Sequence, residues 1–212
     1  MIKSFLEFPL MGILRGVEIS YIEELVKTLI NSGLKVLEIT MNTPRAEEII
    51  SLAHRAANGR IHVGAGTIVC EKSLTSAINA GAEFIVTPGY FQGVVNSCVQ
   101  KKVPVFPGAF SPTEVFSAWQ SGASMVKLFP AGVFGPKYIK ELKGPFNDIK
   151  IMAVGGVKKE NMREFFNAGA SAVAFGTSVF SKELLLKKDF TAIGTMVNEY
   201  VKEIKNIIGE NN

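Results

Sequence analysis

The chain repeats one signal four times, and this repeat constrains the fold more than any other feature of its 212 residues. In each copy a helical segment ends in a small or polar residue followed by glycine, and an apolar run begins directly after it. The four endings are Asn31-Ser32-Gly33, Asn79-Ala80-Gly81, Gln120-Ser121-Gly122 and Asn167-Ala168-Gly169. Their glycines are 48, 41 and 47 residues apart.

Each interval has room for two strand, loop and helix units, because one such unit takes about 20 to 25 residues. The apolar runs between the marked ones also end alike, at Ile13-Leu14-Arg15-Gly16, Val63-Gly64-Ala65-Gly66, Val105-Phe106-Pro107-Gly108 and Ala153-Val154-Gly155-Gly156. Eight alternating units predict a closed parallel (β/α)8 barrel ringed by helices, the TIM barrel architecture. The alternative is an open doubly wound sheet, which does not account for the repeat.

We expect residues 1–212 to form this barrel as a single domain, with a short N-terminal helix at residues 1–8. The first strands are predicted at residues 9–14, 34–40 and 61–66, and the first helices at 20–31 and 43–59. A C-terminal helix at about residues 190–208 closes the ring. No apolar run reaches the roughly 18 residues that a membrane span needs, and the start does not resemble a signal peptide. The expectation is a soluble, cytoplasmic protein that does not bind a membrane.

The composition argues against several other classes of function. Lys and Arg exceed Asp and Glu by only 23 to 19 and are scattered, which does not favour nucleic acid as a partner. Two cysteines and two histidines show no metal-ligand spacing, so no metal is expected. Gly64-Ala65-Gly66-Thr67 begins like a dinucleotide motif, but Val69 stands in the place of its third glycine. We therefore expect no cofactor.

One lysine, Lys127, interrupts the apolar run at residues 124–130. Lysine is rarely buried without a partner, because desolvating an isolated ammonium group costs free energy. The repeat shows which way it faces. Counting from the glycine of each of the four repeat endings, the fourth residue is apolar, as expected for a strand position that faces the surrounding helices. These residues are Leu37, Ile85, Val126 and Val173. The fifth residues therefore face the barrel interior, and they are Glu38, Val86, Lys127 and Ala174.

Glu38 and Lys127 are thus predicted to share one layer of the barrel interior, since alternate strands contribute each layer. The seventh residue after each of these glycines is predicted to lie at the rim formed by the carboxyl ends of the strands. These residues are Thr40, Pro88, Phe129 and Gly176. Active sites of this fold lie at that rim, which favours a catalytic role for the two charged residues. The alternative is a buried ion pair that fixes the register of the barrel.

Two glycine-rich loops follow the last two predicted strands and precede helices, at Gly155-Gly156 and at Gly176-Thr177-Ser178. Glycine lets backbone N–H groups approach an oxyanion, and barrels of this class often bind phosphate in these loops. The alternative is that the glycines only make tight turns and Ser178 caps a helix. Arg15 is a second anion contact, with a rim ion pair as its alternative.

Four aromatic residues and one methionine are also considered as contacts to a ligand. Tyr90 and Phe91 lie in the loop after the fourth predicted strand, from which they could cover the site. Phe116, Trp119 and Met125 are assigned to the core rather than to a ligand.

These motifs together resemble the family of 2-keto-3-deoxy-6-phosphogluconate (KDPG) and 4-hydroxy-2-oxoglutarate (KHG) aldolases, over nearly the whole chain. The carriers are the segments at residues 13–16, 36–40, 64–67, 85–88, 107–108, 126–131 and 155–157. The resemblance implies a class I pyruvate aldolase on a homotrimeric barrel. Its substrate would be a 2-keto-3-deoxy-6-phospho sugar acid, with pyruvate and glyceraldehyde 3-phosphate as products, and it could also cleave 4-hydroxy-2-oxoglutarate to pyruvate and glyoxylate.

The resemblance also implies roles for single residues. Lys127 would form the Schiff base and Glu38 would move protons. Thr67 with Arg15 would hold the pyruvate carboxylate, while Gly155, Gly156, Gly176 and Ser178 would hold the phosphate. Pro88 and Phe129 would contact the substrate from the rim.

One position departs from the pattern of the gluconate-type members. Many of these carry an arginine two residues after the threonine that corresponds to Thr40, where this chain has Asn42. Asn42, Thr43-Pro44 and the Ile-Leu-Arg-Gly start resemble the galactonate-type aldolases instead, so the C4 epimer of the substrate stays open. Two other functions also stay open: a phosphosugar epimerase, and a non-catalytic phosphosugar-binding or assembly protein on the same barrel.

Overall fold

The computed structural model describes residues 1–210, in which strands and helices alternate along the chain. The strands are β1 (Leu10–Leu14), β2 (Val36–Thr40), β3 (His62–Gly66), β4 (Ile85–Val86), β5 (Val105–Phe106), β6 (Gly108–Ala109), β7 (Val126–Leu128), β8 (Ile151–Val154) and β9 (Ala172–Phe175). The helices are α1 (Ile2–Glu7), the 3-10 helix η1 (Ile19–Tyr21), α2 (Ile22–Asn31), α3 (Ala46–Ala57), α4 (Glu71–Asn79), α5 (Gln92–Gln100), α6 (Pro112–Gln120), α7 (Gly135–Lys143), α8 (Met162–Asn167), α9 (Lys182–Leu186) and α10 (Phe190–Glu210).

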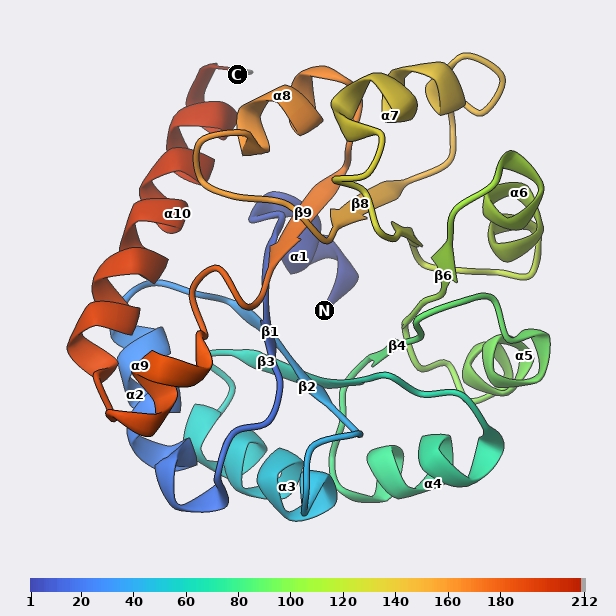
Figure 1. Ribbon diagram of the computed structural model, residues 1–212. Helices are drawn as coiled ribbons and strands as arrows, with labels where there is room; N and C mark the ends of the chain where they lie inside the picture. The colour runs from blue at the N-terminus through green and yellow to red at the C-terminus, as the bar shows by residue number, and fades with distance from the viewer. Residues whose placement is uncertain (211–212) are drawn as a thin grey trace.

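The strands form a parallel barrel surrounded by helices, which confirms the predicted fold class (Figure 1). Their order is β5-β4-β3-β2-β1-β9-β8-β7-β6. The strand segments number nine in residues 1–210 because Pro107, which has no N–H to donate, separates β5 from β6 within the fifth barrel strand. This strand bonds to both neighbours: the Thr87 N–H donates to the Phe106 carbonyl (3.3 Å) and the Lys127 N–H to the Pro107 carbonyl (2.9 Å). The eight predicted positions are therefore present.

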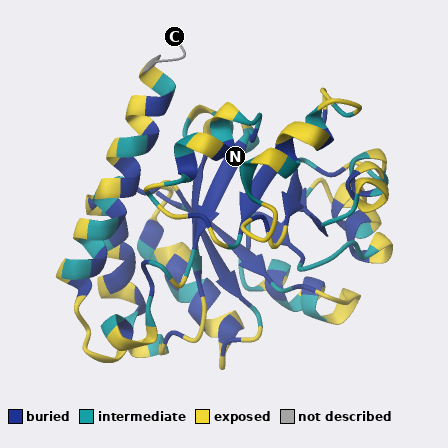
Figure 2. Cartoon of the chain, turned by 45° about the horizontal axis from the view of Figure 1, so that its top comes forward, coloured by how far each residue is buried: buried dark blue, intermediate teal, exposed yellow. Residues whose placement is uncertain are grey.

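The two faces of the strands follow the predicted alternation. The apolar positions assigned to the outer face, Leu37, Ile85, Val126 and Val173, are fully buried in the layer that packs against the helices. A second apolar cluster fills the barrel interior and includes Val86, Phe84, Phe106, Met125 and Met152. The strands are buried along their length, whereas the helices expose only their outer faces (Figure 2).

Helix α1 belongs to the interior cluster rather than to the ring of helices, and it lies within that ring in Figure 1. Its Phe5 is fully buried and packs edge-on against Phe106, with 5.7 Å between the ring centres. Burying an aromatic side chain of this kind contributes about 1.5–3 kcal/mol to folding. The Ser4 hydroxyl of α1 lies 3.1 Å from the Nε2 atom of His62, the first residue of β3, so α1 lies at the amino end of the strands.

The surface differs from the sequence prediction at one residue. Met125 is fully buried and Trp119 half-buried, but Phe116 is 47% exposed and stacks on Phe146 on the outside of the protein. Helical periodicity did not distinguish a residue on the edge of the apolar face of α6 from one in its centre. Within residues 1–210, no helix combines the length and apolar character needed to cross a membrane.

Candidate active site

A cavity of about 680 Å³ lies at the carboxyl ends of the barrel strands. It contains all ten site residues predicted from the sequence, namely Arg15, Glu38, Thr67, Pro88, Lys127, Phe129, Gly155, Gly156, Gly176 and Ser178. Its remaining lining residues are Ile13, Val154, Val157, Lys158, Ala174 and Thr177. The topology explains the assembly, because in a parallel barrel the loops after all the strands meet at one end.

Glu38 is the acidic group of this cavity. Its side chain projects inward from β2 and is only 1% exposed, and neither carboxylate oxygen has a hydrogen-bond partner among the described residues. Burial raises the pKa of Glu38 above its ordinary value of 4.5, and the nearby positive charges of Lys127 and Arg15 oppose this rise. A buried carboxyl without fixed partners can give and take a proton, whereas one locked in hydrogen bonds is held in one state.

Lys127 reaches the same cavity from β7 and is 7% exposed. Its Nζ lies 5.3 Å from the centre of the Phe129 ring, close enough for a favourable cation–π contact. Among the residues that the structure describes, no ion pair joins Lys127 to Glu38. The alternative of a buried ion pair that fixes the register is therefore wrong for this structure, and both groups are available to a ligand.

Gly66 makes room for Glu38, which the sequence analysis did not foresee. A Cβ atom on Gly66 would lie 1.7 Å from the Glu38 Oε1. Likewise, a Cβ on Gly64 would lie 2.4 Å from the Phe84 ring. The absence of side chains at Gly64 and Gly66 thus leaves space in the barrel interior for the side chains of Phe84 and Glu38. A signal was present in the sequence, since Gly64 and Gly66 alternate on the inward face of a buried strand.

Thr67 and Arg15 line the cavity from the ends of β3 and β1. The backbone of Thr67 has φ +60°, in the left-handed region that β-branched residues rarely occupy. Such a conformation costs about 1–3 kcal/mol and is found mainly where function requires it. The Arg15 side chain is exposed and forms no ion pair within residues 1–210, so the rim ion pair considered for it is absent there.

The two glycine-rich loops lie side by side, because β8 and β9 are paired. Gly155 and Gly156 both have positive φ, at +86° and +80°. Helices follow both loops, as predicted, and α8 and α9 begin six residues after Gly156 and Gly176, respectively. Any anion here would meet loop N–H groups rather than the end of a long helix.

Ser178 is not the helix cap that the sequence analysis considered. The cap of α9 is Ser181, whose hydroxyl accepts a hydrogen bond from the Leu184 N–H. Ser178 lies in a single turn closed by the Phe180 N–H and the Gly176 carbonyl (2.9 Å), and its hydroxyl lies 3.2 Å from that of Tyr200. Its place on the cavity wall leaves it available to a ligand.

Tyr90 and Phe91 do not cover the cavity, contrary to the sequence-based expectation. The Tyr90 hydroxyl lies 2.5 Å from that of Ser121, and neither aromatic residue lines the cavity. Asn42 is exposed and lies outside the lining as well. The hydroxyl of the adjacent Thr43 accepts a hydrogen bond from the Gly16 N–H (3.0 Å), which connects the loops after β2 and β1.

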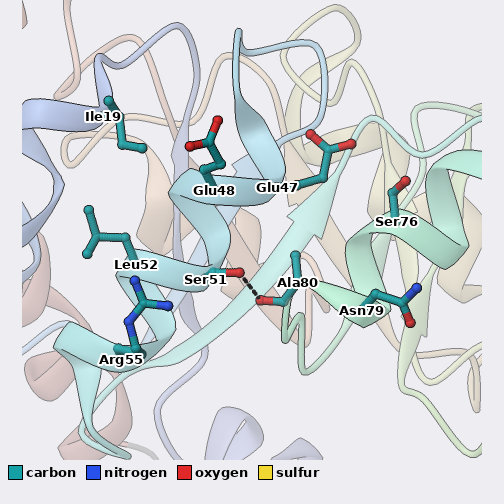
Figure 3. A pocket seen from close by; sticks show the side chains of 9 residues that line it. All are labelled: Ile19, Glu47, Glu48, Ser51, Leu52, Arg55, Ser76, Asn79 and Ala80. Atoms are coloured by element: carbon teal, nitrogen blue, oxygen red, sulfur yellow. Dashed lines mark hydrogen bonds between the residues drawn. The ribbon is translucent and has the colours of Figure 1, made fainter.

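A separate depression of about 540 Å³ lies between α3 and α4 (Figure 3). Its charged side chains, Glu47, Glu48 and Arg55, are exposed, and its dashed contact is a hydrogen bond from the Ser51 hydroxyl to the Ala80 carbonyl (2.9 Å). It lacks a buried titratable group, so we place the chemistry in the barrel cavity instead. Within residues 1–210, no cluster of three His, Cys, Asp or Glu side chains is arranged to hold a metal ion.

Comparison with known proteins agrees with this geometry. The family model described as KDPG and KHG aldolase matches residues 2–196. The chain is 30% identical to the 2-dehydro-3-deoxy-6-phosphogalactonate aldolase of Escherichia coli K12, over 94% of this chain and 98% of that protein. It is 36% identical to the 2-dehydro-3-deoxy-phosphogluconate aldolase of Haemophilus influenzae, over 85% of each chain.

Solved structures show the same relationship. A structure titled native KDPGal matches with a TM-score of 0.89 at 30% identity, over 95% of this chain and 96% of that chain. The KDPG aldolase of Zymomonas mobilis matches with a TM-score of 0.86 at 28% identity, over 94% and 96%. With its fold, its cavity and its sequence in agreement, the chain belongs to the KDPG and KHG aldolase family.

Proposed function

We propose that this protein is a class I aldolase that cleaves a 2-keto-3-deoxy-6-phospho sugar acid into pyruvate and glyceraldehyde 3-phosphate, with residues 1–212 acting as one domain. The observation that carries the proposal is the burial of Lys127 and Glu38 in one cavity without an ion pair between them. Covalent catalysis needs a lysine side chain that can reach the substrate and is not engaged by a carboxylate.

The reaction begins with attack of the Lys127 Nζ on the substrate ketone at C2. The resulting carbinolamine loses water, and a protonated imine (Schiff base) remains. This step needs a proton donor for the departing hydroxyl, and Glu38 is the acidic group in the cavity that can serve, directly or through a water molecule. Burial keeps the Glu38 carboxyl protonated to a higher pH than usual, which suits that role.

Carbon–carbon cleavage follows because the iminium is an electron sink. The C4 hydroxyl gives up its proton to Glu38, the C3–C4 bond breaks, and its electron pair forms the enamine of pyruvate on Lys127. Glyceraldehyde 3-phosphate is the product aldehyde. Protonation of the enamine at C3 and hydrolysis of the imine then release pyruvate and restore the free lysine.

Binding is assigned to the two sides of the cavity. Arg15 and Thr67 hold the carboxylate next to the ketone, and Gly155, Gly156, Gly176 and Ser178 hold the phosphate. Pro88 and Phe129 form the wall around the reacting carbons.

The C4 epimer defines two candidate substrates, since the relatives include both gluconate and galactonate types. Asn42, which departs from the gluconate pattern, does not line the cavity. A panel of both epimers, each with and without the 6-phosphate, together with 4-hydroxy-2-oxoglutarate, tests the proposal through the release of pyruvate. We expect pyruvate from at least one phosphorylated acid, and none from any of them would refute the function.

The assembly is proposed to be a homotrimer that acts in the cytoplasm. Support for an oligomer comes from exposed apolar side chains on and beside α6 and α7, which include Phe116, Val133 and Phe134. Light scattering on the purified protein tests this, and a monomer at micromolar concentration would contradict it.

Replacement of Arg15 with alanine is expected to raise the KM for pyruvate in the condensation direction by about tenfold, because a charge-assisted contact to the carboxylate is lost. The kcat should change less, since Arg15 is exposed and not among the groups that move protons. Steady-state kinetics with saturating aldehyde measure both constants. An unchanged KM would remove Arg15 from carboxylate binding.

Replacement of Gly66 with alanine is expected to lower kcat by about 10²-fold. The new methyl group would overlap the Glu38 carboxylate and displace it, and a shift of about 1 Å in a catalytic group has an effect of this size. Gly66 does not have a positive φ, so its backbone accepts alanine. Gly93, where the nearest atom to a new Cβ is 3.9 Å away, provides the matched control. Equal activity of the Gly66→Ala and Gly93→Ala variants would contradict the assigned position of Glu38.

A further inference from the structure

The cavity carries a cationic side chain that the mechanism above does not use. Lys158 lines it in the loop after β8, next to Val157 and Gly156. Together with Arg15 and Lys127 it makes three basic residues, whereas Glu38 is the only acidic residue in the lining as the structure describes it. Glu38 lies deep in the barrel and Lys158 is exposed. The rim at this loop is therefore electropositive.

The loop that carries Lys158 is held in shape by Asn161. The Lys158 N–H donates to the Asn161 Oδ1 (2.8 Å), and the Asn161 Nδ2 donates to the Gly156 carbonyl (3.0 Å). One side chain thus bridges both ends of the segment at residues 156–158. The backbone from which the Lys158 side chain extends is fixed beside the glycines assigned to the phosphate.

Two adjacent lysines in this loop have different surroundings. The Lys159 Nζ lies 2.8 Å from Glu199 and 3.9 Å from Glu160, which ties it to α10. Lys158 forms no ion pair within residues 1–210, although Glu164 lines a neighbouring cavity on which Lys158 also borders. The Lys158 ammonium group is therefore free to bind an anion, whereas that of Lys159 is already neutralised.

The charge of the substrate supplies the reason for such a group. A phosphate monoester carries about 1.5 to 2 negative charges at pH 7. The N–H groups of the glycine loops offer hydrogen bonds but no net charge, and Arg15 is assigned to the carboxylate end. A lysine at this rim would balance the phosphate as a point charge.

We propose that Lys158 determines specificity: it binds the terminal phosphate and selects phosphorylated over unphosphorylated 2-keto-3-deoxy sugar acids. The inference rests on the proposed aldolase function and adds to it a residue that does not touch the reacting atoms. Lys158 is thus a binding residue and not a catalytic one.

The test compares kcat/KM for a 2-keto-3-deoxy-6-phospho sugar acid with that for the same acid without phosphate. In Lys158→Gln we expect the ratio of the two values to fall about tenfold, through a higher KM for the phosphorylated acid. Lys158→Arg should keep most of the preference because it keeps the charge. Lys159→Gln, the matched control one residue away, should leave the ratio unchanged. An unchanged ratio in Lys158→Gln, including an equal loss with both substrates, would overturn the proposal.

A binding measurement supplies a second readout that does not depend on turnover. Glycerol 3-phosphate, which lacks the aldehyde, should inhibit competitively, with an inhibition constant about tenfold higher in Lys158→Gln than in the wild type. Added salt should reduce this difference, because an exposed charge is screened. An equal inhibition constant in the two proteins would contradict phosphate binding by Lys158.

Borohydride trapping of pyruvate separates this proposal from the proposed function. If the wild type and Lys158→Gln both form the adduct on Lys127 while the substrate ratio stays unchanged, only the role of Lys158 is refuted. If the wild type forms no adduct, the aldolase function itself is refuted.

Discussion

Replacing Lys127 with methionine should reduce cleavage to background, at least about 10⁴-fold below the wild type, because the covalent route is removed entirely. Methionine has a similar length and no charge. Lys127 is 7% exposed and has no carboxylate partner within residues 1–210. Its removal should therefore leave the free energy of unfolding unchanged or raise it, since an apolar side chain suits a buried site better than an unpaired amine.

The control is Lys35→Met, which changes an exposed lysine just before β2 and should keep full activity. Pyruvate release reports activity, and thermal denaturation reports stability. If Lys127→Met keeps a tenth of the activity or more, Lys127 is not the nucleophile. If it loses activity only because it unfolds, the denaturation curve will show it.

Replacing Glu38 with glutamine should lower kcat by about 10² to 10⁴-fold, the usual contribution of a positioned acid or base. Glutamine matches the shape of glutamate but cannot transfer protons. The variant should also be more stable at high pH, because wild-type Glu38 is buried without a hydrogen-bond partner among the described residues. Lower activity together with higher stability in this variant would indicate that Glu38 serves catalysis and not folding.

The pH dependence of the stability follows from the raised pKa of Glu38. In the folded protein the carboxyl keeps its proton above pH 4.5, where the unfolded chain has already lost it. The favourable contribution of the protonated group is thus complete below pH 4.5 and is lost as the pH rises through the folded pKa. The variant should match the wild type at pH 4.5 and exceed it at pH 8 by about 1–3 kcal/mol.

Thermal denaturation of both proteins between pH 4.5 and 8 measures this difference. A difference that does not change with pH, or a wild type that is more stable at pH 8, would show that the Glu38 carboxylate is stabilised by contacts in solution. Its role as a mobile proton carrier would then need revision.

The sequence predicted those features that depend on periodicity. Glycine after each helix marked where strands begin, and the alternation along β2 and β7 placed Glu38 and Lys127 on the same inner face. Both are local rules of backbone geometry that apply wherever a strand is buried on two sides. The ten predicted site residues therefore line one cavity.

The features that were missed depend on contacts between distant segments. Periodicity did not show that Gly66 leaves space for Glu38, because this requires the register between β2 and β3, in which Thr40 is paired with Gly66. Periodicity also did not give the path of the loops. Ser178 was considered as the helix cap, whereas the cap is Ser181. Tyr90 was expected to cover the cavity, whereas its hydroxyl contacts that of Ser121. Loop paths depend on side-chain contacts that strand alternation does not encode.

The most direct test of the central claim is to treat the protein with pyruvate and borohydride and to locate the added mass by peptide mapping. Borohydride reduces a Schiff base to a stable secondary amine, so the modified residue is the one that attacks the ketone. We predict a pyruvate adduct on Lys127 in the wild type and none in Lys127→Met. No adduct in the wild type, or an adduct on another lysine only, would contradict the account.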